Sequence, residues 1–475
     1  MIVLVDPVST GAVLSAALVE RGEDPLHLYG AHLRDAYAHD QHANKWLMDD
    51  PSQAAHRLSE LPVRAVIAAS EWGVTAANHL AHALGLPHHR NSGVRARRDK
   101  AAMHHALRED GLPFAHSVYI RNHDDIAPAS AGFNFPVIVK PVGSTSGDGC
   151  FICAEPAQVR AAVCGGLGQR NLLGVINPAM VIQDYLDGPQ YIVNTVSLGG
   201  RHLLCDIQAA RVDHIRQRPI LRHSLLVTHL DEQTHALVAF TRKCLDAVGV
   251  REGAAHTEVR MTRNGPRLIE VNARMMGASM QPALYRAALG YSHADLVAER
   301  FTDPDALATR FSDCYAPAAA MATAFLNVAV GGTVASFPGM ARLQALPGFH
   351  SLEKVPEVGA SIDAPWLCDG QTGVAHFLHR DREVIAKALQ ELHQLEDDGE
   401  LYQIRPHVEA GRRAGPHRQS HQHLGAPWPE PANRSASAGS PARAQAVSIS
   451  ARSEPPSEAT AEASQVSTID VEVLR

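Results

Sequence analysis

Apolar and polar positions in the first ninety residues alternate between runs typical of strands and stretches with helical spacing. The runs IVLVD (2–6) and RAVIAAS (64–70) predict buried strands, because short continuous apolar runs are typical of parallel sheets. GAVLSAALVERG (11–22) and EWGVTAANHLAHALGLP (71–87) carry the spacing of helices. We therefore expect an α/β domain with a parallel sheet over residues 1–90.

Between residues 91 and 411 strands and helices continue, with no evident internal repeat. A helix is predicted from Asp99 to Gly111, since Asp is a favourable N-cap and Gly-Leu-Pro a stop signal. The further predicted elements are the strands FAHSVYI (114–120), FPVIVKP (135–141), CFICA (150–154) and MVIQDYL (180–186), a helix from Pro156, and the amphipathic helix REVIAKALQELHQLEDDGEL (382–401). We expect two more domains, at 91–187 and 188–411.

The last part of the chain has a different composition. From about Arg412 to Arg475 it is rich in Pro, Ala, Ser, Arg and His, and Trp428 is its one aromatic residue. Such a segment cannot bury enough apolar surface to offset the entropy of ordering it. We predict a disordered tail at 412–475 and assign it no chemistry.

The hairpin between residues 254 and 272 contains the first candidate chemistry. AAHTEVRM (254–261) and RLIEV (267–271) flank a turn predicted at Asn264-Gly265. A three-residue loop, Arg263 to Gly265, would place Glu258 opposite Glu270, and Asn272 and Arg274 would continue the same strand face. Like charges directly opposite are unfavourable, whereas two carboxylates and an amide oxygen suit Mg²⁺. A solvated hairpin face remains the alternative.

Composition narrows the classes of function. The net charge is −7 with histidine counted neutral, and no basic stripe occurs, so nucleic acid is not an expected partner. Seven cysteines without a framework spacing suggest a reducing compartment, and Cys150 and Cys153 are interpreted as buried strand cysteines rather than a redox pair. The 28 histidines include no H-E-x-x-H motif. With no signal peptide and no bilayer-spanning window, we expect a cytoplasmic protein without membrane contact.

A lysine and a glycine-rich segment follow one of the predicted strands. In FPVIVKPVGSTSGDGC (135–150), Lys140 ends the strand, and the small residues after it allow backbone N–H groups to approach phosphate oxygens. The G-x-x-x-x-G-K-[ST] pattern is missing, so this is not a P-loop. The alternatives left open are a polyphosphate-binding loop and a flexible hairpin with a surface lysine.

The strand VIQDYLDGPQY (181–191) runs into a short linker whose backbone could meet the edge of an adenine. A G-x-G-x-x-G after the first strand is absent, so dinucleotide binding has little support.

Taken in order, four motifs resemble those of the ATP-grasp superfamily, in particular the carboxylate–amine ligases of the L-amino acid ligase (dipeptide synthetase) branch. They are RRDKAAM (97–103), FPVIVKPVGSTSGDG (135–149), VIQDYLDGPQY (181–191) and GAAHTEVRMTRNGPRLIEVNARMMGAS (253–279). The likeness extends over about residues 1–405. It implies a Rossmann-like pre-ATP-grasp α/β domain, followed by two α+β lobes that clamp ATP.

The resemblance also implies roles for individual residues. Lys100 and Lys140 resemble the two ATP-binding lysines, and the loop over the phosphates corresponds to Gly143, Ser144, Ser146, Gly147 and Gly149. Gln183, Asp184 and Leu186 correspond to the adenine edge and Gln190 to the ribose contact. Glu258, Glu270 and Asn272 resemble the ligands of Mg²⁺, for which Mn²⁺ could substitute, and Arg274 the arginine at the transferred phosphate. Lys140, Asn272 and Arg274 are thereby the expected catalytic residues.

Two departures from the family pattern bear on these expectations. Gln190 stands where relatives usually have a ribose-binding Glu, and it offers no charge. LRHSLLVTHL (221–230) lacks the Gly-His pair and Pro that relatives tend to carry. The identity of the substrate is therefore the least transferable inference.

The implied reaction has two steps: a carboxylate takes the γ-phosphoryl group of ATP, and an amine then displaces phosphate from the acyl phosphate. An ATP-dependent carboxylase or phosphoryl transferase of the same fold, and a nucleotide-binding module without turnover, are the alternatives. The arginines Arg211, Arg216, Arg218 and Arg222 form either an exposed basic loop or a grip for anionic substrate. The expected partners are small molecules, with a homodimer as an open question.

Overall fold

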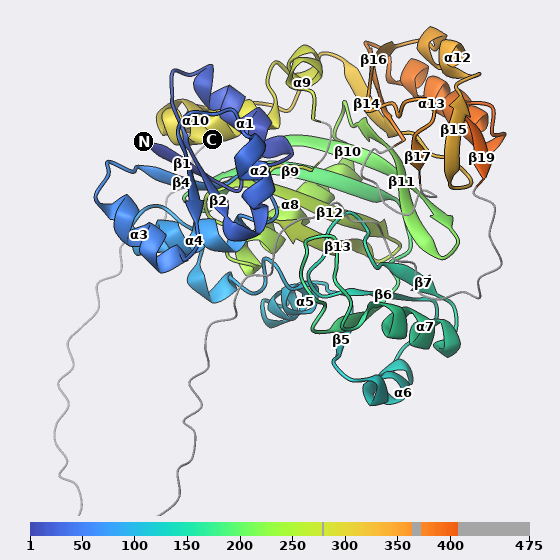
Figure 1. Cartoon of the computed structure of the whole chain (residues 1–475), viewed down its shortest axis with the longest axis horizontal. Coiled ribbons are helices and arrows are strands. Elements are labelled where there is room, and N and C mark those ends of the chain that lie inside the picture. Colours follow the sequence, from blue (N-terminus) through green and yellow to red (C-terminus); the bar gives the residue numbers. More distant parts are fainter. Residues whose placement is uncertain (278–279, 363–371, 407–475) are drawn as a thin grey trace, which may run out of the picture. The chain divides into compact units, whose positions relative to one another are not determined.

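The computed structural model describes residues 1–277, 280–362 and 372–406. The tail predicted at 412–475 lies outside the described residues. Within the described part the strands form four sheets, and the colours of Figure 1 show their order along the chain. The strands of the last two sheets alternate with each other in sequence. Four short 3₁₀ turns accompany them, at Ala31–Leu33, Asn91–Gly93, His123–Asp125 and Arg310–Ser312.

The N-terminal sheet is parallel, as predicted, with the strand order β3-β2-β1-β4. Its strands are β1 (Ile2–Val5), β2 (Leu26–Gly30), β3 (Lys45–Met48) and β4 (Ala65–Ala68). Its helices are α1 (Thr10–Val19), α2 (Arg34–His39), α3 (Pro51–Ser59) and α4 (Val74–Ala83). The central strand β1 is buried along its whole length, which explains its continuous apolar run.

A second, antiparallel sheet has the order β5-β8-β6-β7. Its strands are β5 (Ser117–Ile120), β6 (Val137–Pro141), β7 (Phe151–Cys153) and β8 (Met180–Asp184), accompanied by α5 (Lys100–Glu109), α6 (Ile126–Ser130) and α7 (Pro156–Gly166). The predicted helix start is confirmed, because the Asp99 side chain accepts hydrogen bonds from two backbone N–H groups of the first turn. Cys153 is buried and Cys150 half-buried, and both are free thiols.

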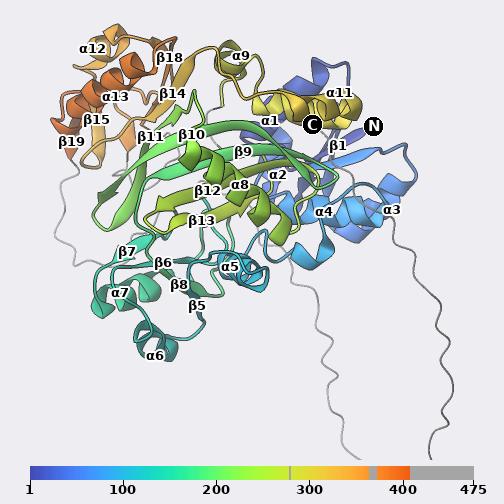
Figure 2. The ribbon, with the colours of Figure 1, turned by 180° about the vertical axis from the view of Figure 1, so that it is seen from behind.

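The largest sheet has eight strands in the order β13-β12-β9-β10-β11-β14-β18-β16. These are β9 (Gln190–Leu198), β10 (Arg201–Ile215), β11 (Arg218–Leu226), β12 (Gly253–Thr262), β13 (Gly265–Asn272), β14 (Ala320–Phe325), β16 (Phe349–Glu353) and β18 (Val374–His379). Helix α8 (Glu232–Ala247) covers the face of β12 and β13, as Figure 2 shows from behind. The opposite face is therefore free to meet the second sheet.

The remaining elements close the described part of the chain. They are α9 (Pro282–Leu289), α10 (His293–Thr302), α11 (Pro304–Thr309), α12 (Met340–Ala345), α13 (Arg382–Asp397) and a three-stranded sheet of β15 (Gly332–Ser336), β17 (Ser361–Ile362) and β19 (Gln403–Pro406). The amphipathic helix predicted at 382–401 is α13, whose apolar face packs into a core with β14 and β18. Among the described helices, none is both long and apolar enough to cross a membrane.

One hydrophobic core joins the N-terminal sheet to the largest sheet. It contains Leu4 of β1 and Leu18 of α1, together with Val196, Cys205 and Met275 from in and around the largest sheet. A shared core restrains relative motion far more than a polar contact would. The loops at the carboxyl ends of β1 and β4 are thereby held against the end of β13.

Candidate functional site

The second sheet and the largest sheet enclose a cavity of about 270 Å³. Most of the predicted site residues line it. They are Lys100, Lys140, Ser144, Ser146, Gly147, Gln183, Asp184, Leu186, Gln190, Glu258, Glu270 and Arg274. Three described residues of the predicted set, Gly143, Gly149 and Asn272, are not among those that line it. The four motifs, which are far apart in sequence, are thus brought to one place.

The predicted pair of opposing carboxylates is present, although the turn that produces it differs from the prediction. Glu258 pairs with Glu270 across the hairpin. The loop has two residues, not three, because Thr262 already pairs with Gly265. A β-bulge at Ile269 adds the missing residue and restores the register. The register was thus predicted correctly from an incorrect loop length.

Positive charges surround Glu270. The Nζ atom of Lys100 lies 3.1 Å from its Oε2, and the Asn272 side chain donates to its Oε1 at 3.1 Å. Burial would raise the pKa of Glu270, but Lys100, Lys140 and the Asn272 hydrogen bond outweigh it and lower the pKa to about 2. Burial, assisted by the charge of Lys100, lowers the pKa of Lys140. The cavity therefore holds an ionised carboxylate that is paired with Lys100 and stabilised by the charge of Lys140.

Glu258 has a different set of neighbours. Gln190 donates to its Oε2 at 2.8 Å, so the amide that replaces the usual ribose-binding Glu is engaged with a predicted metal ligand. The Nε2 atom of His256 lies 3.6 Å from the other carboxylate oxygen. His256 was not predicted, although it stands two residues before Glu258 and so shares its strand face.

The oxygen donors fit Mg²⁺ better than a softer metal. Two opposed carboxylates and an adjacent amide are hard ligands, and nearby lysines could neutralise phosphate oxygens that complete the coordination. In the part of the chain that the structure describes, no group of three or more His, Cys, Asp or Glu side chains is placed to hold a metal ion by itself. An ion here would need substrate oxygens or water as additional ligands.

The glycine-rich loop connects β6 and β7 above this cluster. Ser144 donates to Asp148 at 2.8 Å, and its carbonyl accepts a 2.7 Å hydrogen bond from Lys100. Gly149 has a φ of +64°, and a Cβ there would lie 2.8 Å from the Pro141 ring, so a larger residue would be strained. The loop thus contacts one of the predicted phosphate-binding lysines directly.

Apolar side chains also line the cavity. Ile138, Ile152, Tyr185, Leu186 and Ile269 line it, and all except Leu186 were missed by the sequence analysis because they look like ordinary strand residues. Such a wall suits the faces of a purine ring.

Two of the predicted adenine-edge groups are already engaged in the protein. The backbone N–H of Asp184 donates to the carbonyl of His116 at 3.0 Å. The Gln183 side chain donates to Ser117 at 2.8 Å. An adenine edge would therefore meet other backbone groups of 184–186.

Arg274 reaches the cavity by another route than predicted. Strand β13 ends at Asn272, and the N–H of Arg274 turns back to donate to the Asn272 carbonyl at 2.8 Å. The side chain nevertheless lines the cavity, and its Nε donates to Glu71 at 2.7 Å. Glu71, which follows β4, is a site neighbour that no spacing in the sequence indicates.

The arginines of β10 and β11 do not form a common substrate grip. Arg222 is the bulge residue opposite Arg211 and Val212, and it is buried against Asp213, Glu396 and Asp397 at 2.7, 2.9 and 3.0 Å. The Arg211 side chain also pairs with Asp213. Arg218 lies over the Phe151 ring, with its guanidinium carbon 4.4 Å from the ring centre. The grip hypothesis is therefore wrong for Arg222.

A buried network of hydrogen bonds, which the sequence did not reveal, holds the His256 side chain in place. Asn194 accepts from His256 at 2.9 Å and donates to Asp206 at 2.8 Å, while Gln208 links Asp206 to Tyr285. Burial raises the pKa of Asp206 to about 6. The network fixes the His256 ring with Nδ1 toward Asn194 and Nε2 toward Glu258.

The paired sheets with a lysine-lined cavity between them define an ATP-grasp fold. A sequence model of the ATP-grasp domain matches residues 133–282, so the ATP-grasp part of the predicted fold is confirmed, together with a parallel N-terminal sheet. The chain is similar to dapdiamide A synthase of Enterobacter agglomerans, with 27% identity over 313 residues that cover 64% of this chain and 74% of that one. It is also similar to the L-arginine-specific L-amino acid ligase of Bacillus subtilis, with 22% identity over 185 residues, or 38% of this chain and 44% of that one.

A solved structure supports the same fold. The crystal structure of the L-amino acid ligase from Bacillus licheniformis superimposes with a TM-score of 0.66 at 19% identity, covering 85% of this chain and 98% of that one. The chain therefore contains an ATP-grasp domain, and the predicted class, an ADP-forming carboxylate–amine ligase, is confirmed by these relatives. The predicted roles of individual residues remain predictions.

Proposed function

We propose that this enzyme joins the carboxylate of an amino acid or another small acid to an amine, forming an amide or dipeptide with ADP and phosphate as co-products. The observation that carries the proposal is that Glu258 and Glu270 line the same cavity as Lys100, Lys140 and Arg274. A cavity built only to bind a nucleotide would not need two ionisable carboxylates beside the lysines. The proposal includes the division into domains at 1–90, 91–187 and 188–411, the first of them Rossmann-like.

In the first step a carboxylate oxygen of the acid attacks the γ-phosphorus of ATP, and the bond to the β,γ-bridging oxygen breaks to release ADP. Lys100 and Lys140 bind phosphate oxygens and limit their repulsion of the anionic nucleophile. Arg274 donates to the transferred group, where negative charge is redistributed. The apolar wall around Ile138 and Ile152 would receive adenine.

Glu258, Glu270 and Asn272 would hold Mg²⁺ or Mn²⁺, which supplies charge neutralisation at the phosphate oxygens. Before such an ion arrives, Glu270 is satisfied by Lys100 and Asn272, and Glu258 by Gln190. The neighbouring lysines keep Glu270 ionised, and the strand register places Glu258 opposite it in the hairpin.

In the second step the amine nitrogen attacks the acyl carbon, phosphate leaves, and the amine loses a proton. Water competes with the amine for the acyl phosphate, so the site has to exclude it. The loop from Gly143 to Gly149 is suited to this role because it lies over the lysines and contacts Lys100 through Ser144.

An ADP-release screen tests the proposal. Purified protein with MgATP is offered common L-amino acids and small acids, singly and in pairs, and separately bicarbonate with each amine. ADP and phosphate that form with a carboxylate–amine pair, together with an amide detected by mass spectrometry, are the expected result. ADP release that depends on bicarbonate, or nucleotide binding without turnover under every condition, contradicts the proposal.

A further inference from the structure

Glu71 lies between two arginines that are remote from it in sequence. Its Oε2 accepts a 2.7 Å hydrogen bond from Nε of Arg274, which is 203 residues away. Its Oε1 accepts from Nη1 of Arg98, which stands just before α5. Glu71 is 9% and Arg274 8% exposed, so the contact is largely shielded from water. Three segments of the chain thus meet at one carboxylate.

The contact fixes the direction of the Arg274 guanidinium. Nε donates to Glu71, and Nη1 donates to the Met275 carbonyl at 2.7 Å. Nη2 has no hydrogen-bond partner among the described residues, while the side chain lines the cavity. The guanidinium is therefore held through Nε and Nη1, and its Nη2 group is left to donate to a ligand.

Glu71 is itself held firmly by the fold. It follows β4, and two residues later a Cβ on Gly73 would lie only 2.4 Å from the carbonyl oxygen of Val5, so this turn is pressed against the end of β1. The N-terminal sheet is in turn anchored to the largest sheet by the shared core.

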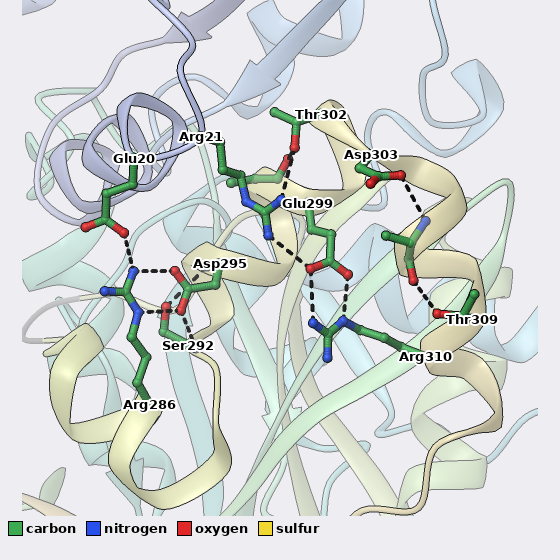
Figure 3. Close-up of polar contacts among 12 residues, drawn as sticks. Glu20, Arg21, Arg286, Ser292, Asp295, Glu299, Thr302, Asp303, Thr309 and Arg310 are labelled. Atoms are coloured by element: carbon green, nitrogen blue, oxygen red, sulfur yellow. Dashed lines mark hydrogen bonds and ion pairs between the residues drawn. The ribbon is translucent and has the colours of Figure 1, made fainter.

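Ion pairs around α1 and α10 add to that anchoring, as Figure 3 shows. Arg286 contacts Glu20 at 2.6 Å, and Arg21 contacts Glu299 at 3.0 Å. Arg21 follows α1 in the N-terminal domain, whereas Arg286 lies in α9, so each of the two segments supplies one arginine. The carboxylate of Glu71 thus has a rigid support that does not depend on nucleotide.

Two guanidinium groups this close would repel each other without a shared carboxylate. Burial lowers the pKa of Arg98 to about 10, with the charge of Arg274 acting in the same direction, and burial lowers the pKa of Arg274 as well. A carboxylate that bridges both offsets their repulsion. Removal of Glu71 would leave Arg274 free to turn away from the other arginine.

We infer that Glu71 is a positioning residue, which, with Arg98, holds Arg274 in the orientation that receives the transferred phosphoryl group. The inference rests on the proposed function. Donors that are oriented before the reaction stabilise developing charge without reorganising, whereas a mobile arginine would have to be ordered in each turnover. The N-terminal domain thereby completes the site, although Glu71 itself is not among the residues that line the cavity.

Glu71→Gln is the main test, with MgATP and the amino-acid pair found active in the screen. We expect kcat to fall by about tenfold to a hundredfold, since one oriented donor is lost, and the Kd of MgATP to stay within about threefold. On an Arg274→Lys background the same change should cause little further loss, because the residue that it positions is already gone. Glu71→Asp, which keeps the charge but is shorter, should fall between the wild type and Glu71→Gln, and it replaces Glu71→Gln if that variant does not fold.

Glu20→Gln is the matched control, because it removes a carboxylate from another ion pair between the same two parts of the chain without touching Arg274. Its kcat should equal that of the wild type. A kcat for Glu71→Gln within about twofold of this control, or equal losses on the wild-type and Arg274→Lys backgrounds, would overturn the inference.

A readout without turnover separates this inference from the proposed function. The ¹H–¹⁵N signal of Arg274 Nε, assigned by its loss in Arg274→Lys, should be sharp and slow to exchange in the wild type and should move and broaden in Glu71→Gln. If the wild type releases no ADP with any pair, the proposed function fails, yet this signal still shows whether Glu71 holds the Arg274 side chain in place. An Nε signal that is unchanged in Glu71→Gln overturns the inference even in an active enzyme.

Discussion

Two hairpins of the largest sheet carry similar mixtures of arginine and acidic residues, yet only one faces the cavity. On β12 and β13, Glu258 and Glu270 oppose each other and meet Lys100 from another part of the chain. On β10 and β11, Arg222 is buried and shared among Asp213, Glu396 and Asp397. The first group lines the cavity, whereas Arg222 is already engaged by three carboxylates of the protein.

The difference shows what distinguishes a site from a structural ion cluster. A cluster whose charges are neutralised by several buried partners is complete without a ligand, and its loss is felt mainly as lost stability. A cluster that lines a cavity, with like charges opposed across a hairpin, remains incomplete until a ligand arrives. Mutations at the first hairpin should therefore lower turnover with little loss of stability, and mutations at the second should lower stability with little loss of turnover.

The largest expected effect is on turnover at the first hairpin. Glu270→Gln keeps the shape of the side chain and removes its charge, so we expect kcat to fall by about a thousandfold at saturating Mg²⁺, with the melting temperature nearly unchanged. Steady-state kinetics and thermal unfolding measure the two quantities. A variant that retains more than about a tenth of the wild-type rate would contradict the metal-binding role.

At the second hairpin the effect should be on stability alone. Arg222→Met leaves the buried Glu396 carboxylate without its arginine, and the free energy of unfolding should drop by about 3 kcal/mol. Arg211→Met is the control, since within residues 1–277, 280–362 and 372–406 this half-exposed arginine pairs with Asp213 alone, and it should cost less than about 1 kcal/mol. Urea unfolding measures both. The comparison fails if Arg222→Met instead raises the KM for the carboxylate in a protein of normal stability.

A smaller effect is expected on nucleotide affinity. Lys140→Ala should weaken MgATP binding by about thirtyfold, and Lys140→Arg by less, because arginine keeps the charge but not the geometry. Calorimetry measures the affinities. Hydrogen exchange at 143–149 should slow on adding MgATP, since the loop is expected to close over the phosphates. Wild-type affinity in both variants, with exchange in the loop unaffected by nucleotide, would show that the loop is not a phosphate lid.

The smallest expected effect is on stability at mildly acidic pH. Burial lowers the pKa of His104 to about 3 and that of His293 to about 4, below the usual 6.5 of the unfolded chain. Unfolding then takes up protons, so the stability that is fully present above pH 6.5 is lost as the pH falls toward these values. Each histidine should contribute a loss of about 1 kcal/mol between pH 6.5 and pH 5.5, because the unfolded histidine is half protonated at the upper value and almost fully protonated at the lower one.

Urea unfolding at the two pH values measures this slope. His104→Gln should reduce it, whereas His56→Gln, whose side chain is 83% exposed, should leave it as in the wild type. Equal slopes in all three proteins would mean that His104 is not held neutral by the fold.

Local patterns predicted much of the fold, including the parallel N-terminal sheet and the N-cap at Asp99. They did not reveal β2 and β3, because LHLYG and KWLM are short and each contains a polar residue. The pairing of Glu258 with Glu270 was predicted because the hairpin is local, although a bulge was needed to produce it.

Contacts between distant segments could not be predicted. Glu71 meets Arg274 over 203 residues, and Glu396 meets Arg222 over 174, so no spacing in the sequence brings either pair together. The bulge at Arg222, which changes the face of the strand that its side chain occupies, is likewise not indicated by the spacing of the arginines. The face on which a charge lies depends here on tertiary structure.

Transfer of ¹⁸O tests the central claim, that the carboxylate is activated as an acyl phosphate, most directly. The carboxylate substrate of the active pair is labelled with ¹⁸O in both oxygens, and the phosphate released in the presence of MgATP and the amine is analysed by mass spectrometry. An acyl phosphate requires one labelled oxygen in each phosphate, because the bond between carbon and the bridging oxygen breaks when the amine attacks. Phosphate without label, formed at the same rate as the amide, would contradict the account.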